Sequence, residues 1–490
     1  MPLSVLEPKA LWQHFQTLCD TPRPSKHEAV LIAKIRGWAE TNGIENFLDQ
    51  AGNLILRKKA SPGCEKALPV VMQSHLDMVA QKRSHSAHDF FNDPIQPRIE
   101  NNWVYATDTT LGADNGIGVA AILAVFGAAD IQHGPLEALL TVDEEAGMSG
   151  AKGLQAGILN AQVLLNLDTE EEGELYVGCA GGVDVCATFN LQLLPVESVI
   201  RNTASALQIN ISGLKGGHSG IDIHKPLANA NQLLARLLDV ALQQGAALAQ
   251  IQGGTLRNAI SRDAAATVCI NPEQMDVLIQ ALHSEFQKIQ AEYGSTEKTL
   301  NLQLENCPVP AQVMQMQQAK NIIAALLACP HGVRRWSDQF AGVVETSNNL
   351  GVIRQQENTL QVYNLTRSLL DIGRDAQVQA IRHLFTLAGA MVEESNAYPG
   401  WAPVRESPLM DLMQQVHHNC FGHNAKVQII HAGLECGILG AAYPHWQMIS
   451  FGPSIRGAHS PDEGVNIHSV QQFWLYLCAA LKALSERKAL

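Results

Sequence analysis

The sequence predicts an α/β protein in which one domain, built on a mainly parallel sheet, is split by a smaller inserted α/β domain. The 490 residues are too many for one ordinary hydrophobic core, so two domains are expected. Up to Gly182, apolar strands alternate with helices, and acidic residues follow the strand ends. This order is typical of a parallel sheet, whose sites lie at the carboxyl ends of its strands.

Two changes in the character of the sequence mark the inserted domain. A Pro-bearing segment at residues 189–205 forms the first boundary, and the Pro/Gly-rich YPGWAPV, which starts at Tyr398, forms the second. We therefore assign residues 1–187 and 399–490 to one domain and residues 188–398 to the insertion. A strand–helix–strand–helix order occurs twice within the insertion, which indicates a twofold α/β module.

Composition and charge predict a globular protein that binds neither nucleic acid nor membranes. Hydrophobic residues make up 46% of the chain and charged residues 17%, and the formal net charge is −13. The longest weakly polar run, Gly116–Ala129, is shorter than the ~20 residues that span a bilayer. The first residues lack the pattern of a secretion signal, and the ten cysteines form no C-x-x-C pair. We therefore expect reduced thiols and a cytoplasmic location.

The first part of the chain alternates helical and strand patterns. Apolar spacing predicts helices at Pro8–Cys19 and Glu28–Thr41, and two alternating runs around residues 50–53 predict a hairpin. A buried strand follows at Val70–Val79. The polar segment Gln81–Asp108 is expected to be an ordered loop with a short hairpin.

The buried strand runs into a His-x-Asp pair. His75 and Asp77 are two residues apart, so they project to the same face of the strand. His75 could bind a metal ion, and Asp77 could accept the other ring N–H and fix the tautomer. Such pairs are common by chance, so the prediction depends on the acidic residues further along the chain.

Later acidic residues also stand next to apolar segments. Asp114 precedes a buried helix, where it could be a ligand or simply an N-cap. Three adjacent acids, Asp143, Glu144 and Glu145, follow the strand Leu136–Val142, and Asp168 follows the strand Gln162–Leu167. Adjacent acids repel one another unless a cation or a shared proton offsets their charges. The alternative is that these acids form a solvated turn and bind no cation.

Two further histidines stand in loops. An alternating strand leads into a Gly-rich turn that carries His218, and a strand followed by a long loop carries His459. We interpret His417, His418 and His423, at a helix end, as surface or packing residues. The remaining expected elements are a strand at Ala264–Ile270 and helices at Leu227–Gln243, Met275–Ala291, Ala376–Val392 and Val470–Leu484.

Together these residues form a candidate metal site. Mixed imidazole and carboxylate ligands suit zinc or a similar divalent ion, and one carboxylate can bridge two ions. Glu144, next to a ligand but free, could act as general base in an amide hydrolysis. The five candidate ligands are His75, Asp114, Glu145, Asp168 and His459.

Six motifs carry a resemblance to a known family. HLDMV, TTLGADNGIG, TVDEEAG, NLDTEEEGE, GLKGGHSG and GAHSPDE occur in this order, and the chain resembles the aminoacylase/carnosinase-type di-zinc metallopeptidases over essentially its whole length. The resemblance implies two Zn²⁺ per chain, for which Co²⁺ or Mn²⁺ can substitute. It implies these roles: Asp114 as the bridging carboxylate, His75 and Asp168 in one zinc site, Glu145 and His459 in the other, Asp77 as the residue that orients His75, and Glu144 as the base.

The resemblance also implies roles for the insertion, as a lid domain through which two chains form a homodimer. His218 is expected to polarise the substrate carbonyl, in its own or in the partner subunit's site. Arg367 could bind the C-terminal carboxylate of a substrate or form a surface salt bridge. Asn258 could hydrogen-bond the peptide or occupy a turn, and Glu435 could meet the substrate amine or cap a helix.

The implied activity is hydrolysis of unblocked dipeptides of broad sequence, Xaa-His included. The expected mechanism is attack by a metal-bridging hydroxide, with Glu144 as the base. One alternative is an N-acyl-amino-acid deacylase of the same family with a different pocket. The other is a non-catalytic binding protein, which the presence of all seven metal, orienting and base residues disfavours.

Overall fold

The protein divides into two compact units in a computed structural model, which describes residues 3–200 and 203–490. Unit 1 consists of Met1–Gly178, Pro403–Ile429 and Leu434–Leu490, and unit 2 consists of Cys179–Ala402 and Ile430–Gly433. Unit 2 is thus inserted in the chain between parts of unit 1, and the predicted α/β class is confirmed. Residues 187 and 398 remain a proposal as domain limits.

Unit 1 is built on an eight-stranded sheet whose centre is parallel. In it, β3 runs parallel to β6 and β7, and β7 runs parallel to β23. β3 and β6 are buried along their whole length, as expected for strands covered on both faces. The strands, in spatial order, are β1 (Glu45–Leu48), β2 (Leu54–Lys58), β6 (Leu136–Thr141), β3 (Val70–His75), β7 (Val163–Asn166), β23 (Gln447–Ser450), β8 (Glu174–Cys179) and β22 (Lys426–Ile430).

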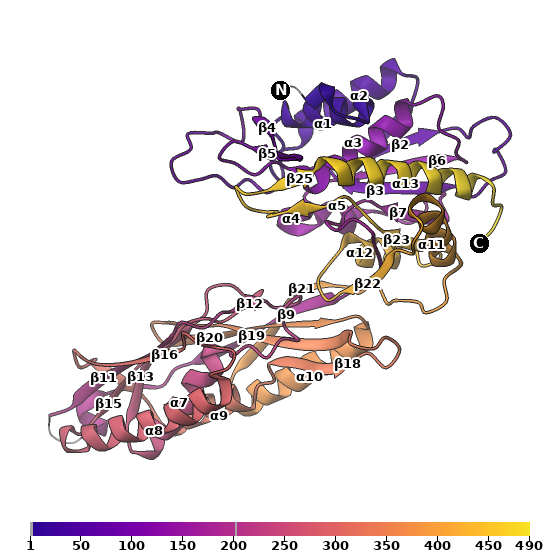
Figure 1. The fold of residues 1–490 in the computed structure, drawn as a ribbon. Helices are drawn as coiled ribbons and strands as arrows, with labels where there is room; N and C mark the ends of the chain where they lie inside the picture. The colour runs from indigo at the N-terminus through magenta and orange to yellow at the C-terminus, as the bar shows by residue number, and fades with distance from the viewer. Residues whose placement is uncertain (1–2, 201–202) are drawn as a thin grey trace. The chain divides into compact units, whose positions relative to one another are not determined.

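Helices pack against this sheet and form one hydrophobic core with it. α3 (Ala113–Gly127) contacts β3, and α1 (Lys9–Cys19) packs on α3 (Figure 1). α3 is almost entirely apolar, which fits a helix enclosed between a sheet and another helix. The other helices of unit 1 are α2 (Ala29–Thr41), α4 (Glu144–Gly147), α5 (Ser149–Gly153), α11 (Pro408–Phe421), α12 (Glu435–Ala442) and α13 (Ile467–Ser485).

A small four-stranded sheet in unit 1 contains the hairpin expected within residues 81–108. Its strands, in spatial order, are β24 (Ile455–Arg456), β25 (Gly464–Asn466), β5 (Trp103–Ala106) and β4 (Pro97–Glu100). β4 and β5 are antiparallel and form the hairpin. The long loop between β24 and β25 carries His459.

Unit 2 has a nine-stranded antiparallel sheet with helices along one face (Figure 1). The sheet strands are β16 (Asn301–Cys307), β11 (Ser205–Ser212), β15 (Ala264–Ile270), β13 (Ala247–Gly253), β19 (Val344–Gln356), β20 (Thr359–Ser368), β9 (Gly181–Asn190) and β21 (Met391–Tyr398), with β18 (Gly332–Trp336) beside β19. The helices are α7 (Ala230–Gln243), α8 (Met275–Tyr293), α9 (Met316–Ala328) and α10 (Asp371–Leu387). A short pair, β12 (Gly217–His218) and β14 (Ala259–Ile260), carries His218.

Two predicted helix limits in unit 2 are wrong for local reasons. The helix expected at Ala376–Val392 spans Asp371–Leu387, because Gly389 at φ +97° ends it and the following residues form β21. The helix expected from Leu227 starts at Ala230, because the Asn229 side chain accepts hydrogen bonds from the first turn and caps it. Among the described residues, no helix is both long and apolar enough to cross a membrane.

Candidate metal centre

The predicted ligands of unit 1 come from segments that meet at one edge of the central sheet. His75 is the last residue of β3, and Asp168 follows β7 by two residues. Glu145 stands in α4, which follows β6. Because β3, β6 and β7 run parallel, their carboxyl ends lie side by side, and this brings the three residues together.

Asp114 lies between two histidines. Its Oδ1 is 3.1 Å from Nε2 of His75, and its Oδ2 is 3.3 Å from Nε2 of His459. The same nitrogen of His75 is 3.5 Å from Oδ1 of Asp168, and that of His459 is 3.0 Å from Oε2 of Glu145. The two oxygens of Asp114 therefore face two different histidine–carboxylate pairs, as the oxygens of a bridging carboxylate do.

The predicted N-cap alternative for Asp114 does not describe its backbone. Asp114 has a non-helical ψ of 113° inside the first turn of α3. The residue that precedes the helix is Gly112, at φ +69°. The carboxylate is thus turned to the two histidines, with which it forms its close contacts.

The donor atoms and their charges fit divalent cations. Ligand atoms of His75, Asp114 and Asp168 lie within 4.8 Å of one another, and so do those of Asp114, Glu145 and His459. Burial and neighbouring negative charges raise the pKa of Glu145 and Asp168. Oε1 of Glu145 is buried and has no hydrogen-bond partner in the described part of the chain. Two dications would offset these charges, and imidazole–carboxylate sets suit zinc.

Glu144 is an acid of this cluster whose pKa is perturbed. Burial, followed by the charges of Asp168 and other carboxylates, raises its pKa well above the usual value. One of its oxygens also lies within 4.8 Å of ligand atoms of His75 and Glu145. A carboxylate of raised pKa beside a cation site has the properties of a general base.

The carboxylate of Asp77 connects the ligand segments. It is fully buried, lies 3.4 Å from Nδ1 of His75, and accepts hydrogen bonds from the N–H groups of Glu144 and Glu145 at 3.0 and 3.1 Å. Burial alone would raise the pKa of Asp77, but hydrogen bonds from His75 and Ser25 outweigh it and lower the pKa to about 2. An ionised Asp77 directs Nε2 of His75 toward the cluster.

Two residues near Asp114 that the sequence analysis did not single out support its loop. Asn115 donates through Nδ2 to the carbonyl of Leu167 at 2.8 Å and to Oδ1 of Asp168. Glu463 accepts hydrogen bonds from four consecutive N–H groups, those of residues 111–114, at 2.7–3.2 Å. Both lie inside motifs already noted, TTLGADNGIG and GAHSPDE, but nothing in the sequence shows to which groups they bond.

Glu435 is enclosed inside unit 1. Its Oε2 accepts hydrogen bonds from Gln73 at 2.6 Å and from Thr141 at 2.7 Å. Burial raises its pKa to about 7, and the charges of His75 and Asp168 act on it. The predicted contact with a substrate amine stays a prediction. Glu435 is the first residue of α12, and the side chains of Gln73 in β3 and Thr141 in β6 hold its carboxylate.

In unit 2, His218 is held as a hydrogen-bond donor. Its Nδ1 accepts hydrogen bonds from the N–H groups of Gly220 and Ile221 at 3.2 and 3.1 Å. A neutral imidazole has one accepting and one donating nitrogen, so Nε2 carries the proton. Burial, helped by the positive charge of Arg367, lowers the pKa of His218 to about 4. The ring is therefore neutral at pH 7.

Arg367 lies close to His218 within unit 2. It is 6% exposed, and within residues 3–200 and 203–490 no carboxylate forms an ion pair with it, so it forms no surface salt bridge. Nη1 donates to Oη of Tyr398 at 2.8 Å, while Nε is buried and lacks a partner among the described groups. A buried guanidinium with a free N–H has the donors that a carboxylate needs.

Asn258 and His431 complete the polar residues of this region. Asn258 is exposed, and its carbonyl accepts from the N–H of Ser219. His431, which the sequence analysis did not single out, is buried, and its Nε2 lies 2.8 Å from Oγ of Ser347. Burial, followed by the charge of Arg367, lowers the pKa of His431 to about 3. His431 begins the stretch HAGLECG, which shares in the family resemblance but carries no signal for the contacts of this residue.

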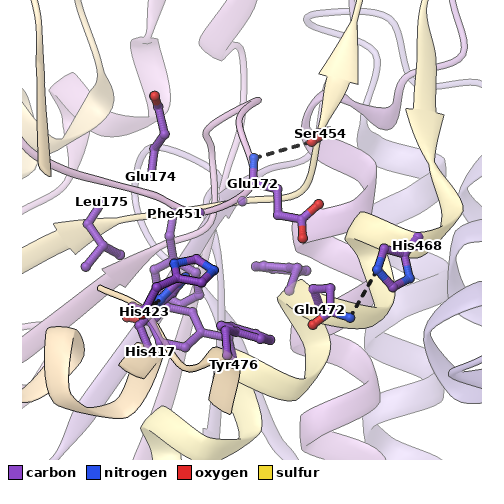
Figure 2. Close-up of a pocket in the computed structure, with 14 residues that line it drawn as sticks. Glu172, Glu174, Leu175, His417, His423, Phe451, Ser454, His468, Gln472 and Tyr476 are labelled. Carbon is purple, nitrogen blue, oxygen red and sulfur yellow. Dashed lines mark hydrogen bonds between the residues drawn. The ribbon is translucent and has the colours of Figure 1, made fainter. Parts of the chain in front are cut away.

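A separate cavity of unit 1 contains two of the three histidines that we interpreted as surface or packing residues, while the third, His418, is exposed (Figure 2). It measures about 480 Å³ and is lined by His417 and His423 beside Tyr476, with His468 and Glu172 opposite. His417 is buried and bonds through Nδ1 to the carbonyl of His423. In the described part of the chain, these histidines belong to no group of three close ligand atoms. Packing around Tyr476 accounts for His417.

Comparison with known proteins gives matches over nearly the whole chain. The family described as peptidase family M20/M25/M40 matches residues 71–483. The cytosol non-specific dipeptidase of Escherichia coli (strain K12) is 45% identical over 483 residues, which cover 98% of this chain and 99% of that protein. The crystal structure of aminoacylhistidine dipeptidase from Vibrio alginolyticus has a TM-score of 0.90 and 45% identity, covering 99% of this chain and 98% of that one. A tripeptidase structure from Staphylococcus aureus, 16% identical with a TM-score of 0.57 and covering 98% and 100% of the two chains, shares the fold.

The tautomer and pKa of His218 can be tested directly. In a proton–nitrogen correlation spectrum of protein labelled in its histidines, His218 should show protonated Nε2 and unprotonated Nδ1, and should gain its second proton only as the pH falls to about 4. The spectrum of His218→Gln assigns the signal. Because the unfolded imidazole is protonated below about pH 6.5, this shift stabilises unit 2 above that pH and the stabilisation is lost as the pH falls toward 4. A signal that titrates near 6.5 would contradict the prediction.

Proposed function

Because the chain belongs to the peptidase family M20/M25/M40, we propose that it is a metal-dependent dipeptidase that hydrolyses unblocked dipeptides of broad sequence, Xaa-His included. The observation that supports this most directly is the position of Asp114, whose two oxygens face two separate histidine–carboxylate pairs. A shared carboxylate of this kind suits two cations that act together on one amide bond.

The relatives support this substrate class. The protein from Escherichia coli is named a non-specific dipeptidase, and the structure from Vibrio alginolyticus an aminoacylhistidine dipeptidase. Both are 45% identical to this chain over almost all of its length, which favours dipeptides over the N-acyl amino acids of the alternative prediction. The name of the relative from Escherichia coli supports a cytoplasmic location, and the homodimer formed through unit 2 stays a proposal.

We assign the cations to the following residues of unit 1. His75 and Asp168 would hold one, Glu145 and His459 the other, and Asp114 both. Zinc is the first choice for this donor set, and Co²⁺ or Mn²⁺ can replace it. When bound, such a pair lowers the pKa of water and polarises a carbonyl oxygen.

The proton transfers are assigned to Glu144. Its carboxylate has a raised pKa because it is buried among other negative charges, so it accepts a proton more readily than an exposed glutamate. It would take the proton of the attacking water and pass it to the leaving amine. Asp77 keeps its own charge, since its pKa is about 2, and orients His75.

Residues of unit 2 are assigned to the substrate. The Nε2–H of His218 would donate a hydrogen bond to the carbonyl oxygen as negative charge develops there. The free N–H of Arg367 would bind the C-terminal carboxylate, and Asn258 would hydrogen-bond the peptide. Glu435 is proposed for the free amine of the substrate, which distinguishes unblocked dipeptides from acylated ones.

A substrate panel tests the activity. Protein stripped of metal and reloaded with zinc should release amino acids from free dipeptides, and not from tripeptides or N-acetyl amino acids, as read by mass spectrometry. The metal-free protein is the control and should be inactive. Release from the N-acetyl compounds alone would contradict the dipeptidase assignment and support the deacylase.

Replacement of the base separates proton transfer from metal binding. We expect Glu144→Gln to keep its zinc content and lose roughly 10²- to 10⁴-fold in kcat, since the amide cannot accept the proton. Glu171→Gln, a change at an exposed acid of the same unit, should keep full activity. Normal turnover by Glu144→Gln, measured with its zinc content, would remove Glu144 from this role.

The bridging position of Asp114 predicts an unequal effect of two similar substitutions. Asp114→Asn should weaken both cation sites, because its oxygens face both ligand pairs, while Asp168→Asn should weaken one. Elemental analysis after dialysis should show a larger loss of zinc per chain for Asp114→Asn. Asp239→Asn, in α7 of unit 2, serves as the control. Equal losses in the two ligand variants would argue against a bridge.

A further inference from the structure

The segment Arg23–Glu28, with the sequence RPSKHE, joins the metal centre from outside the ligand motifs. It lies between α1 and α2, before residues 71–483 that the family model matches. Pro24 forms a parallel bridge with Met78, and the N–H of Met78 donates to the carbonyl of Arg23 at 3.2 Å. The segment thus runs beside the chain that leaves β3 after His75.

Arg23 connects two of the ligand-bearing segments. Its buried Nη1 donates to the carbonyls of Leu76 and Asp77 at 2.9 and 2.8 Å, and its Nη2 donates to the carbonyl of Gly112. A Cβ at Gly112 would lie 2.5 Å from Nη2, so this approach needs glycine. One guanidinium therefore holds the end of β3 and the loop that carries Asp114 at a fixed separation.

Ser25 contacts the orienting carboxylate itself. Its Oγ donates to Oδ2 of Asp77 at 2.7 Å. The same oxygen accepts the N–H of Glu145, and Oδ1 accepts that of Glu144. Because the Asp77 carboxylate sets the direction of the His75 ring, the hydroxyl of Ser25 helps to fix that direction as well.

Glu28 holds the turn that presents the two glutamates. Its Oε1 accepts hydrogen bonds from the N–H groups of Asp143 and Lys26, both at 3.0 Å. Asp143 is in the left-handed region at φ +56° and immediately precedes Glu144. A buried acceptor for its N–H stabilises this uncommon backbone conformation.

We propose that Arg23, Ser25 and Glu28 are positioning residues of the metal centre. They act through the backbone and through Asp77, and by fixing the ligand directions they raise the affinity for the cations. This inference rests on the proposed function, in which the cluster holds two divalent ions. Loss of such outer partners typically costs 10- to 100-fold in metal affinity.

Ser25→Ala is the primary test because it removes one hydroxyl at a half-buried position. We expect its Kd for Zn²⁺, measured by competition with a chromophoric chelator, to rise about 10-fold or more, and its Co²⁺ absorption spectrum to change. Ser25→Thr keeps the hydroxyl and should restore both. Ser61→Ala, which removes a hydroxyl bonded to the Ile131 carbonyl of the same unit, should leave both unchanged.

A second pair of variants separates positioning from general stability. Glu28 and Glu137 are each 5% exposed, and each accepts hydrogen bonds from two backbone N–H groups. Glu28→Gln should weaken zinc binding about 10-fold, while Glu137→Gln should not, although Glu137→Gln also breaks the ion pair with Arg57 and should lower the unfolding temperature of the metal-free protein at least as much.

Two results would overturn the proposal. One is an unchanged Kd for Zn²⁺ in both Ser25→Ala and Glu28→Gln, and the other is an equal loss of affinity in Glu137→Gln. Failure of the proposed function would look different, because wild-type protein with zinc bound would then hydrolyse no peptide. The comparison of zinc affinities would still decide whether these residues position the ligands.

Discussion

The buried carboxylate of Asp77 holds together the segments that carry the proposed metal ligands. It accepts hydrogen bonds from the consecutive N–H groups of Glu144 and Glu145 and from the hydroxyl of Ser25. It also faces the ring of His75. These groups come from three separate parts of the chain, so one anion fixes an imidazole, a short helix and an N-terminal segment together. Since a buried carboxylate without donors is costly, each of these donors also keeps Asp77 ionised.

The parallel arrangement of β6, β3 and β7 explains why acids distant in sequence form one cluster. Parallel neighbours place their carboxyl ends at a common edge, where His75 ends β3 and Asp168 and Glu144 follow β7 and β6 by two and three residues. The resulting crowding of negative charge would destabilise an empty cluster, because burial raises the cost of each charge. Cations remove that cost, so metal binding and the folding of this edge should be coupled.

The clustering of the proposed ligands could be predicted from sequence because they stand at or near strand ends, whereas their supports could not. His75 ends an apolar strand and Asp168 follows one, and that pattern is visible in the sequence. Glu463 instead accepts hydrogen bonds from backbone N–H groups 349 to 352 positions earlier in the chain. Arg23 donates to backbone carbonyls 53 to 89 positions later. Such contacts depend on the tertiary structure, which apolar periodicity does not encode. The predicted end of α10 was wrong for a related reason. The helical spacing of apolar residues in the sequence continues past Gly389, although the helix itself ends before it.

The two units use opposite electrostatic conditions for their polar residues. Unit 1 contains carboxylates whose pKa values are raised because they are buried close together. The cluster therefore favours the binding of cations or protons. Unit 2 buries His218 and His431 near the guanidinium of Arg367, and burial, helped by that positive charge, lowers the pKa of both imidazoles so that they stay neutral at pH 7. A dipeptide presents a carbonyl to be polarised and a carboxylate to be bound. Under the proposed function, the neutral donor of His218 suits the carbonyl and the free guanidinium N–H of Arg367 suits the carboxylate, while the acidic cluster of unit 1 suits the metal ions.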